Sequence, residues 1–166
     1  MPLRLSKSTL KLLIAPAVIA LLSVCGALAQ SSVSDVYSQA ELEAKAQALM
    51  KQAVDSPNGL AGITLEKYPS HFSMLNVRTR TGGAEIHAHF ADIFFVIDGE
   101  ASLVTGGTVV DPKENPNGET SGSSVKGGQQ RKLVKGDIVH ISAGVPHQLV
   151  IDPGKTFAYF VFKVQQ

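Results

Sequence analysis

From Gly62 to the end of the chain, short apolar runs alternate with breaks rich in Gly, Pro and Asp. Many short strands at even spacing are typical of an antiparallel sandwich or barrel. The dipeptide Asp98-Gly99, placed between two apolar runs, predicts a tight hairpin turn. The pattern therefore predicts an all-β domain whose strands span residues 62–68, 72–79, 85–89, 92–97, 101–105, 131–134, 137–141, 148–151 and 157–163.

A helical pattern precedes these strands. Ser38 and Glu41 have the spacing of a capping box, in which each residue satisfies a free backbone N–H of the other. Apolar residues then recur at helical spacing, and residues 55–59 contain the strong breaker Ser-Pro-Asn-Gly. We expect a helix from about residue 38 to 53 that packs one face on a larger body, through Leu42, Ala46, Leu49 and Ala53.

The segment 106–130 interrupts the strand pattern with a high content of Gly, Pro, Asn, Ser and Lys. Loops of this length are either functional covers or disordered insertions. The residue pattern does not distinguish these alternatives, and both stay open.

The first 29 residues have the order of a secretory signal peptide. A basic stretch without acidic residues precedes an apolar run over 12–24, and Ala27-Leu28-Ala29 follows as a small-residue cleavage site. The apolar run is shorter than the roughly 20 residues of a membrane-spanning helix. We expect cleavage after Ala29 and export to the periplasm or the medium, without stable membrane insertion of the mature chain. The alternatives are an anchor through an uncleaved signal or through acylation of Cys25.

Composition narrows the chemistry further. The chain has 15 basic and 14 acidic residues and no run of basic residues, which argues against nucleic acid as a partner. Cys25 is the only cysteine, so the mature chain would have no thiol. A disulfide, a cysteine nucleophile and a thiolate ligand are then all excluded. Any metal site has to use nitrogen and oxygen ligands.

Two histidines lie in one predicted strand. His87 and His89 are two residues apart, so their side chains would project from the same face. Two neutral imidazoles on one face are a good start for a metal site. Asp92 follows after two residues and would direct a carboxylate into an otherwise apolar interior. Burial of that charge is costly unless a cation or a hydrogen-bond donor compensates it.

A second histidine cluster follows between residues 136 and 147. Gly136 and Gly144 permit turns, Pro146 stiffens the chain, and His147 leads into an apolar strand. His147 would supply a third imidazole from a neighbouring strand. His140 could line the cavity as an acid–base group, although a hydrogen-bonded histidine in the sheet is the simpler explanation.

These two segments resemble a known family. The segment 82–99, written G…HxH…D(x6)G, is similar to the first motif of the cupin superfamily, and the segment 136–147, written G(x5)SxG(x2)H, is similar to its second motif. The resemblance implies an antiparallel jelly-roll barrel of six to eight strands. We therefore expect a signal peptide over 1–29, a helical flank over 30–60 and a cupin β-barrel domain over 61–166.

The resemblance also implies a metal site. Carried over by position, the ligands are His87, His89 and His147, with Asp92 at the place of the family's glutamate ligand. Two departures stand out. Aspartate replaces glutamate, and two residues separate it from His89 where three or four are common. The direct ligation of a metal by Asp92 is therefore open.

The expected function is that of a metal-dependent enzyme, of oxygenase, isomerase or lyase type, acting on a small molecule. The ligands suit one divalent transition metal, which is Fe, Mn, Zn, Ni, Co or Cu. Asp92 and His140 are the candidate catalytic residues, and Arg78 and Arg80 would favour an anionic substrate if they face the barrel mouth. A non-catalytic binding module and a purely structural ion site are the alternatives. Pairing of two barrels into a homodimer stays open.

Overall fold

The computed structural model describes residues 34–166. The predicted signal peptide, its cleavage site and Cys25 lie outside the described residues. Val36–Gln166 forms one compact unit. Within the described part of the chain, every helix is too short or too polar to cross a membrane.

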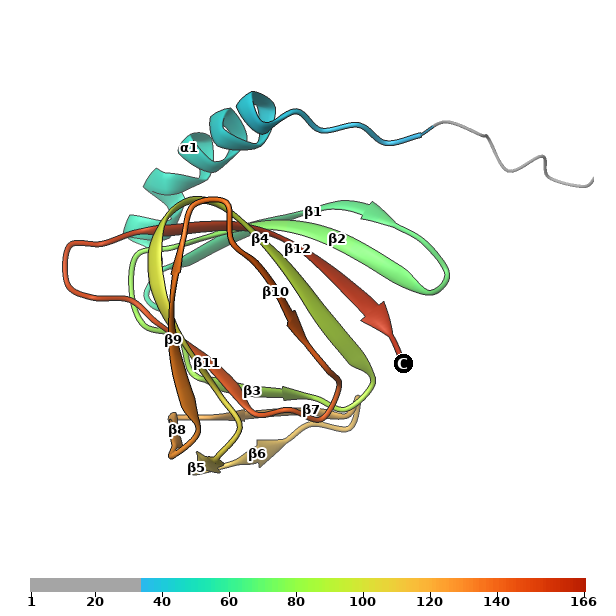
Figure 1. The fold of residues 1–166 in the computed structure, drawn as a ribbon, viewed down its shortest axis with the longest axis vertical. Coiled ribbons are helices and arrows are strands. Elements are labelled where there is room, and N and C mark those ends of the chain that lie inside the picture. Colours follow the sequence, from blue (N-terminus) through green and yellow to red (C-terminus); the bar gives the residue numbers. More distant parts are fainter. Residues whose placement is uncertain (1–33) are drawn as a thin grey trace, which may run out of the picture. The chain divides into compact units, whose positions relative to one another are not determined.

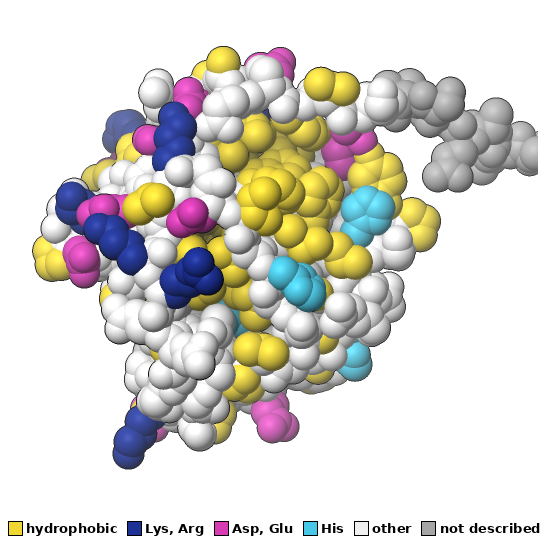
Figure 2. All heavy atoms as spheres, in the orientation of Figure 1, with side chains coloured by type: hydrophobic (Ala, Val, Ile, Leu, Met, Phe, Trp, Pro, Cys, Tyr) yellow, Lys and Arg dark blue, Asp and Glu magenta, His cyan; other side chains and the backbone are white. Residues whose placement is uncertain are grey.

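The predicted helix is present as α1, Gln39–Asp55. Ser38 caps its N-terminus, and the capping box is complete: the Ser38 hydroxyl accepts from the Glu41 backbone N–H, and the Glu41 carboxylate accepts from the Ser38 N–H. Its buried residues are the four predicted from the apolar spacing, and they pack against Leu75, Val77 and Phe160 of the sheet. Apolar side chains gather beside α1 on the face shown in Figure 2, around a shallow groove lined by Phe95 and Phe162.

The strands form an antiparallel barrel, as predicted. One sheet contains β1, β2, β12, β10 and the first half of β4. The other contains the second half of β4 with β9, β11, β3, β7 (Glu119–Gly122) and β6 (Lys113–Glu114). Figure 1 shows the two sheets on opposite sides of the barrel interior. The strand bounds are β1 Leu60–Lys67, β2 His71–Arg78, β3 Ala84–His87, β4 Phe90–Thr105, β9 Gln129–Val134, β10 Ile138–Ile141, β11 His147–Val150 and β12 Phe157–Gln165.

The hairpin predicted at Asp98-Gly99 is wrong. The chain does not reverse there, because β4 continues through both residues and passes from one sheet to the other. Gly99 has φ +78°, and the register of β12 against β4 shifts between Ala158 and Tyr159. A left-handed glycine at a bulge bends a strand and leaves it continuous. The expected strands 92–97 and 101–105 are therefore two halves of one strand.

The segment 106–130 is ordered in the structure. It contains β5 Thr108–Val110, β6 Lys113–Glu114, β7 Glu119–Gly122 and β8 Ser124–Lys126. β5 pairs with β8 as a small separate sheet, whereas β7 pairs with β3 and extends the barrel wall. In this register Glu119 lies directly opposite His87. The segment thus contributes to the wall that holds the histidines.

The interior of the barrel is divided between an apolar core and a polar cavity. The core packs Phe94, Leu103, Leu133 and Phe157, all nearly inaccessible to solvent. Along β2, side chains alternate between the two faces. Leu75 and Val77 pack under α1, whereas Arg78 lines the internal cavity. The alternation of side chains along β2 thus places apolar residues under α1 and polar residues in the internal cavity.

We expect Gly99→Ala to destabilise the barrel strongly. A left-handed conformation costs alanine about 1–2 kcal/mol, and a Cβ at Gly99 would lie 2.0 Å from the Thr156 carbonyl oxygen. Gly154→Ala is the matched control, because Gly154 has φ +78° but open space around its Cβ position. Urea unfolding should show at least twice the loss of unfolding free energy for Gly99→Ala as for the control. Equal losses would contradict the proposed role of Gly99 as the bend of β4.

Candidate metal centre

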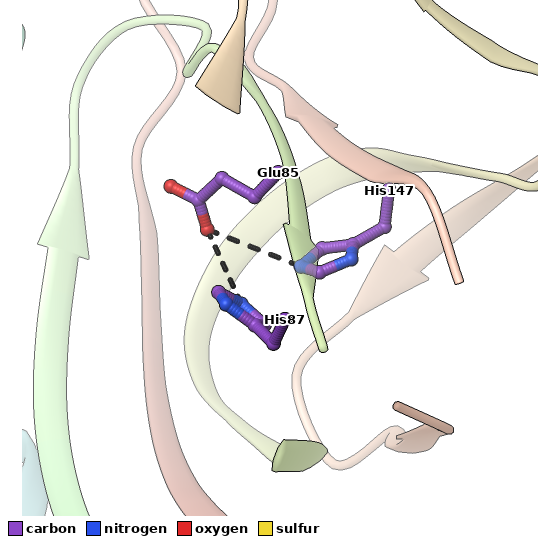
Figure 3. Close-up of side chains that lie close together, drawn as sticks. All are labelled: Glu85, His87 and His147. Carbon is purple, nitrogen blue, oxygen red and sulfur yellow. Dashed lines mark ion pairs between the residues drawn. The ribbon is translucent and has the colours of Figure 1, made fainter. Parts of the chain in front are cut away.

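Glu85, His87 and His147 converge at one end of the cavity. Glu85 and His87 are two residues apart on β3 and so share a face. His147 begins β11, whose register pairs it with Glu85. One potential ligand atom of each residue lies within 4.8 Å of those of the other two, and Figure 3 shows the carboxylate directed at both imidazoles. His87 and His147 are only 8% and 4% exposed.

The ring orientation of His147 is suited to metal binding. Its Nδ1 lies 3.0 Å from the Val145 carbonyl oxygen, so Nδ1 carries the proton and donates it. The Nε2 atom is therefore a free lone pair, and it is buried without a hydrogen-bond partner. Burial lowers the pKa of His147 and favours the neutral ring. A neutral imidazole oriented by a second hydrogen bond is the usual form of a histidine ligand.

His87 is held in a similar way by a carboxylate. Its Nδ1 contacts Oε2 of Glu119, and its Nε2 lies 3.6 Å from Oε2 of Glu85. Burial acts to lower the pKa of His87, but the nearby carboxylates of Asp92 and Glu119 outweigh it, so that the pKa is raised. The pair of Glu119 and His87 has the connectivity of the carboxylate–histidine pairs that support metal sites.

Asp92 lies beside this group and is neutralised by a lysine. The side chain is 2% exposed, and Nζ of Lys163 lies 2.8 Å from each of its carboxylate oxygens. The register of β4 and β12 places Lys163 directly opposite Asp92. Burial acts to raise the pKa of Asp92, but His87 and Lys163 lower it overall, so that the carboxylate stays ionised. The cation that the buried carboxylate requires is thus supplied by the chain itself.

Lys163 also reaches the imidazole of His87. Its Nζ lies 2.6 Å from His87 Nε2, and Oδ2 of Asp92 lies 3.4 Å from the same nitrogen and 3.8 Å from Nε2 of His147. Nε2 of His87 therefore accepts a hydrogen bond from the ammonium group. A metal and Lys163 compete for this single lone pair.

His89 and His140 lie away from the group. The expected common face of His87 and His89 is absent, because β3 ends at His87 and His89 is exposed in the bend that follows. A Cβ on Gly118 would lie 2.8 Å from Nε2 of His89, so the ring packs against that glycine. His140 is exposed on β10 and does not line the cavity, because the strand directs Ile141 inward.

Three residues of the site, Glu85, Glu119 and Lys163, were not predicted from the sequence. Spacing provides a signal for Glu85: the pair Glu85 and His87 has the same two-residue period as HxH, and four residues separate His87 from Asp92. If Glu85 and His87 take the places of the two histidines of HxH, the separation from Asp92 is the four residues common in the family motif. Counted from His89, it is only two residues. Glu119 and Lys163 come from distant segments, and their positions depend on strand registers that the sequence does not fix.

The donor set fits a divalent metal. Two ligand atoms bound at about 2.0–2.2 Å to the same ion are at most about 4.4 Å apart. Oε2 of Glu85 lies within this limit of both imidazoles, at 3.6 Å from Nε2 of His87 and 3.9 Å from Nε2 of His147, and the ligand atoms of the two imidazoles lie within 4.8 Å of each other. The buried Nε2 of His147 has no competing partner. Two imidazoles and a carboxylate are ligands for Fe, Mn, Co, Ni, Cu and Zn.

The centre opens into a cavity of about 200 Å³. Its polar lining includes Arg78, Glu85, Asp92 and Lys163, and its apolar lining includes Phe94 and other core side chains. This volume is below the roughly 300–1,000 Å³ of pockets for drug-sized ligands. The cavity is therefore suited to a small molecule.

Comparison with solved structures identifies the fold. The chain is similar to salicylate 1,2-dioxygenase from Pseudoaminobacter salicylatoxidans, with 16% identity, a TM-score of 0.52, and coverage of 75% of this chain and 31% of that chain. A DMSP lyase from Ruegeria pomeroyi DSS-3 gives 18% identity, a TM-score of 0.47, and coverage of 63% and 46%. The chain thus spans less than half of either protein.

A cupin 2 conserved barrel domain protein from Salinispora arenicola CNS-205 gives 20% identity, a TM-score of 0.46, and coverage of 64% of this chain and 76% of that chain. No protein-family model and no curated protein matches the sequence. The chain has an antiparallel β-barrel fold, as predicted, and this fold is similar to that of salicylate 1,2-dioxygenase.

Proposed function

We propose that this chain is a metal-dependent enzyme of cupin type that acts on a small molecule, with the metal held by Glu85, His87 and His147. The observation that carries the proposal is the convergence of two buried imidazoles and a carboxylate at the end of a cavity, with Nε2 of His147 left without any other partner. A buried polar atom without a partner is costly unless something binds it.

A metal in this position would act as a Lewis acid toward a substrate oxygen or toward dioxygen. Two histidines and one carboxylate leave coordination positions open, which is the pattern of many Fe(II) oxygenases. Oxygenase, isomerase and lyase chemistry remain alternatives, because a fold does not choose between them.

The surrounding side chains have distinct roles in this proposal. Glu119 and the Val145 carbonyl orient the two imidazoles through their Nδ1 atoms. Asp92 and Lys163 form an ion pair beside the ligands, and Lys163 can donate hydrogen bonds to an oxygen atom of a bound molecule. The apolar wall around Phe94 keeps bulk water from the inner part of the cavity.

A second function is favoured by one specific observation. Lys163 already donates to His87 and neutralises Asp92, so the polar interior is largely compensated by the chain itself. A binding module that works without a metal would have this arrangement. Metal analysis and turnover measurements on the same preparation distinguish the two.

We further propose that the protein is exported, on the basis of the first 29 residues. Cleavage after Ala29 would leave Gln30 as the first residue of the mature protein. Mass spectrometry of the protein recovered from the periplasm or the medium tests this. A full-length chain retained inside the cell would contradict it.

We expect His87→Ala and His147→Ala to lose the bound metal and any turnover, because each removes a ligand. His89→Ala is the matched control, since His89 is exposed and outside the ligand group. It should retain full metal content by elemental mass spectrometry. Loss of metal in His89→Ala with retention in His147→Ala would show that the ligand set is wrong.

We expect Glu119→Ala to lower metal affinity by about 10–100-fold, the usual effect of removing a partner that orients a histidine ligand. The reason is that Nδ1 of His87 would lose its carboxylate acceptor. Glu114→Ala, an exposed change on the neighbouring strand β6, is the control. Competition with a chromogenic chelator measures both affinities, and equal values for the two variants would contradict the orienting role.

We expect Lys163→Met to destabilise the metal-free protein by about 3–5 kcal/mol, because removing one partner of a buried ion pair leaves the other charge uncompensated. Lys132→Met removes an exposed lysine paired with Glu100 and should change the stability little, because exposed ion pairs contribute little to it. If a metal takes the freed lone pair of His87, added Zn²⁺ should restore much of the stability of Lys163→Met. Thermal unfolding with and without Zn²⁺ measures this, and an unchanged loss in Zn²⁺ would favour the metal-free module.

A further inference from the structure

Arg78 places a second positive charge inside the cavity. It lies at the end of β2 and is 7% exposed, although arginine is rarely buried without a partner. It lines the same cavity as Glu85, Asp92 and Lys163. Unlike Arg80, which is exposed and donates to the Pro57 carbonyl, Arg78 is directed into the barrel.

The guanidinium group of Arg78 is incompletely neutralised. Its nearest carboxylate oxygen, Oε1 of Glu85, lies 3.8 Å from Nη2, beyond the distance of a good hydrogen bond. Its Nε is buried and has no hydrogen-bond partner. A buried guanidinium normally forms two parallel hydrogen bonds to a carboxylate or phosphate. Arg78 therefore has unused capacity to bind an anion.

The backbone around Arg78 is built to admit this side chain. A Cβ on Gly82 would lie 2.6 Å from Nη1 of Arg78, so a larger residue at this position would displace the guanidinium. Tyr159 lines the same cavity, where burial raises the pKa of its hydroxyl, and the charge of Arg78 and a hydrogen bond with Arg78 oppose that rise. The hydroxyl therefore stays neutral beside the guanidinium and does not compensate its charge.

We infer that Arg78 is the anchor for the carboxylate of a small substrate. This deepens the proposed function, since it assigns the substrate class of the same cavity. Glu85 shows the required span: one of its oxygens lies 3.8 Å from Arg78, and the other lies 3.6 Å from His87 and 3.9 Å from His147. A carboxylate bound to Arg78 thus places its neighbouring carbon next to the ligand group.

Charge and size support a small carboxylic acid. The cavity holds two cations, Arg78 and Lys163, and two carboxylates, Glu85 and Asp92. Lys163 and Asp92 compensate each other at 2.8 Å, so Arg78 is the cation with charge to spare. A bound divalent metal would draw Glu85 toward itself and make the cavity still more positive. The volume of about 200 Å³ admits an acid of a few carbon atoms.

The test compares pyruvate with pyruvamide, a neutral amide of nearly the same shape, by isothermal titration calorimetry on the full chain. We expect the wild-type protein and Arg80→Gln to bind pyruvate at least about tenfold more tightly than pyruvamide. In Arg78→Gln the affinities for pyruvate and pyruvamide should be about equal. Arg78→Lys, which keeps the charge and loses the paired geometry, should lie between the two and serves if Arg78→Gln does not fold.

Two results would overturn the inference: no preference for pyruvate in the wild-type protein, or an unchanged preference in Arg78→Gln. Metal content, measured on the same samples, separates this inference from the proposed function. A preference that depends on Arg78 in a protein that takes up no metal would support the carboxylate subsite and refute the metal-dependent enzyme. Normal metal uptake without a preference for pyruvate would refute the carboxylate subsite and support the metal site.

Discussion

The interior of this barrel is organised around a buried carboxylate. Asp92 is 2% exposed, and an ionised group in such a position is stable only if the surrounding structure supplies opposite charge and hydrogen bonds. The register of β12 against β4 supplies Lys163 at 2.8 Å, and the ends of β3 and β11 bring His87 and His147 within 4 Å of the same carboxylate. The polar residues of both sheets thus lie together around Asp92, where their opposite charges and hydrogen bonds offset the cost of their burial.

The continuity of β4 makes this meeting possible. Asp92 lies in its first half, opposite Lys163, and Thr105 at its end pairs with His147. The bend at Gly99 lets one covalent strand belong to both sheets, so the histidines of one sheet are fixed relative to the ion pair of the other. An isolated hairpin at Gly99 would have kept both halves of the strand in one sheet and separated these groups.

Local patterns in the sequence predicted much of this architecture. The capping box and apolar spacing gave α1, alternation gave most strands, and the buried carboxylate of Asp92 implied a nearby cation. The identity of that cation was not accessible, because Lys163 lies 71 residues away and its position depends on strand register. Glu85 takes the place expected for His89 beside His87 because β3 ends at His87, and strand ends are set by tertiary contacts. The four residues between His87 and Asp92 were nevertheless a signal that Glu85 and His87 form the pair.

If the cavity binds a metal at Glu85, His87 and His147 and an anion at Arg78, as proposed, the arrangement of charges would couple the two. A metal needs the lone pair of His87 that Lys163 now occupies, and it needs the carboxylate of Glu85 that partly balances Arg78. Because Lys163 is already paired with Asp92, metal binding alone would leave the metal and Arg78 as two incompletely compensated cations, which is unfavourable in an interior of low polarity. An anion at Arg78 removes this repulsion and releases Glu85 to the metal. Because coupling between two sites is reciprocal, a metal in turn strengthens anion binding. The carboxylate of the substrate would thus be part of what completes the metal site.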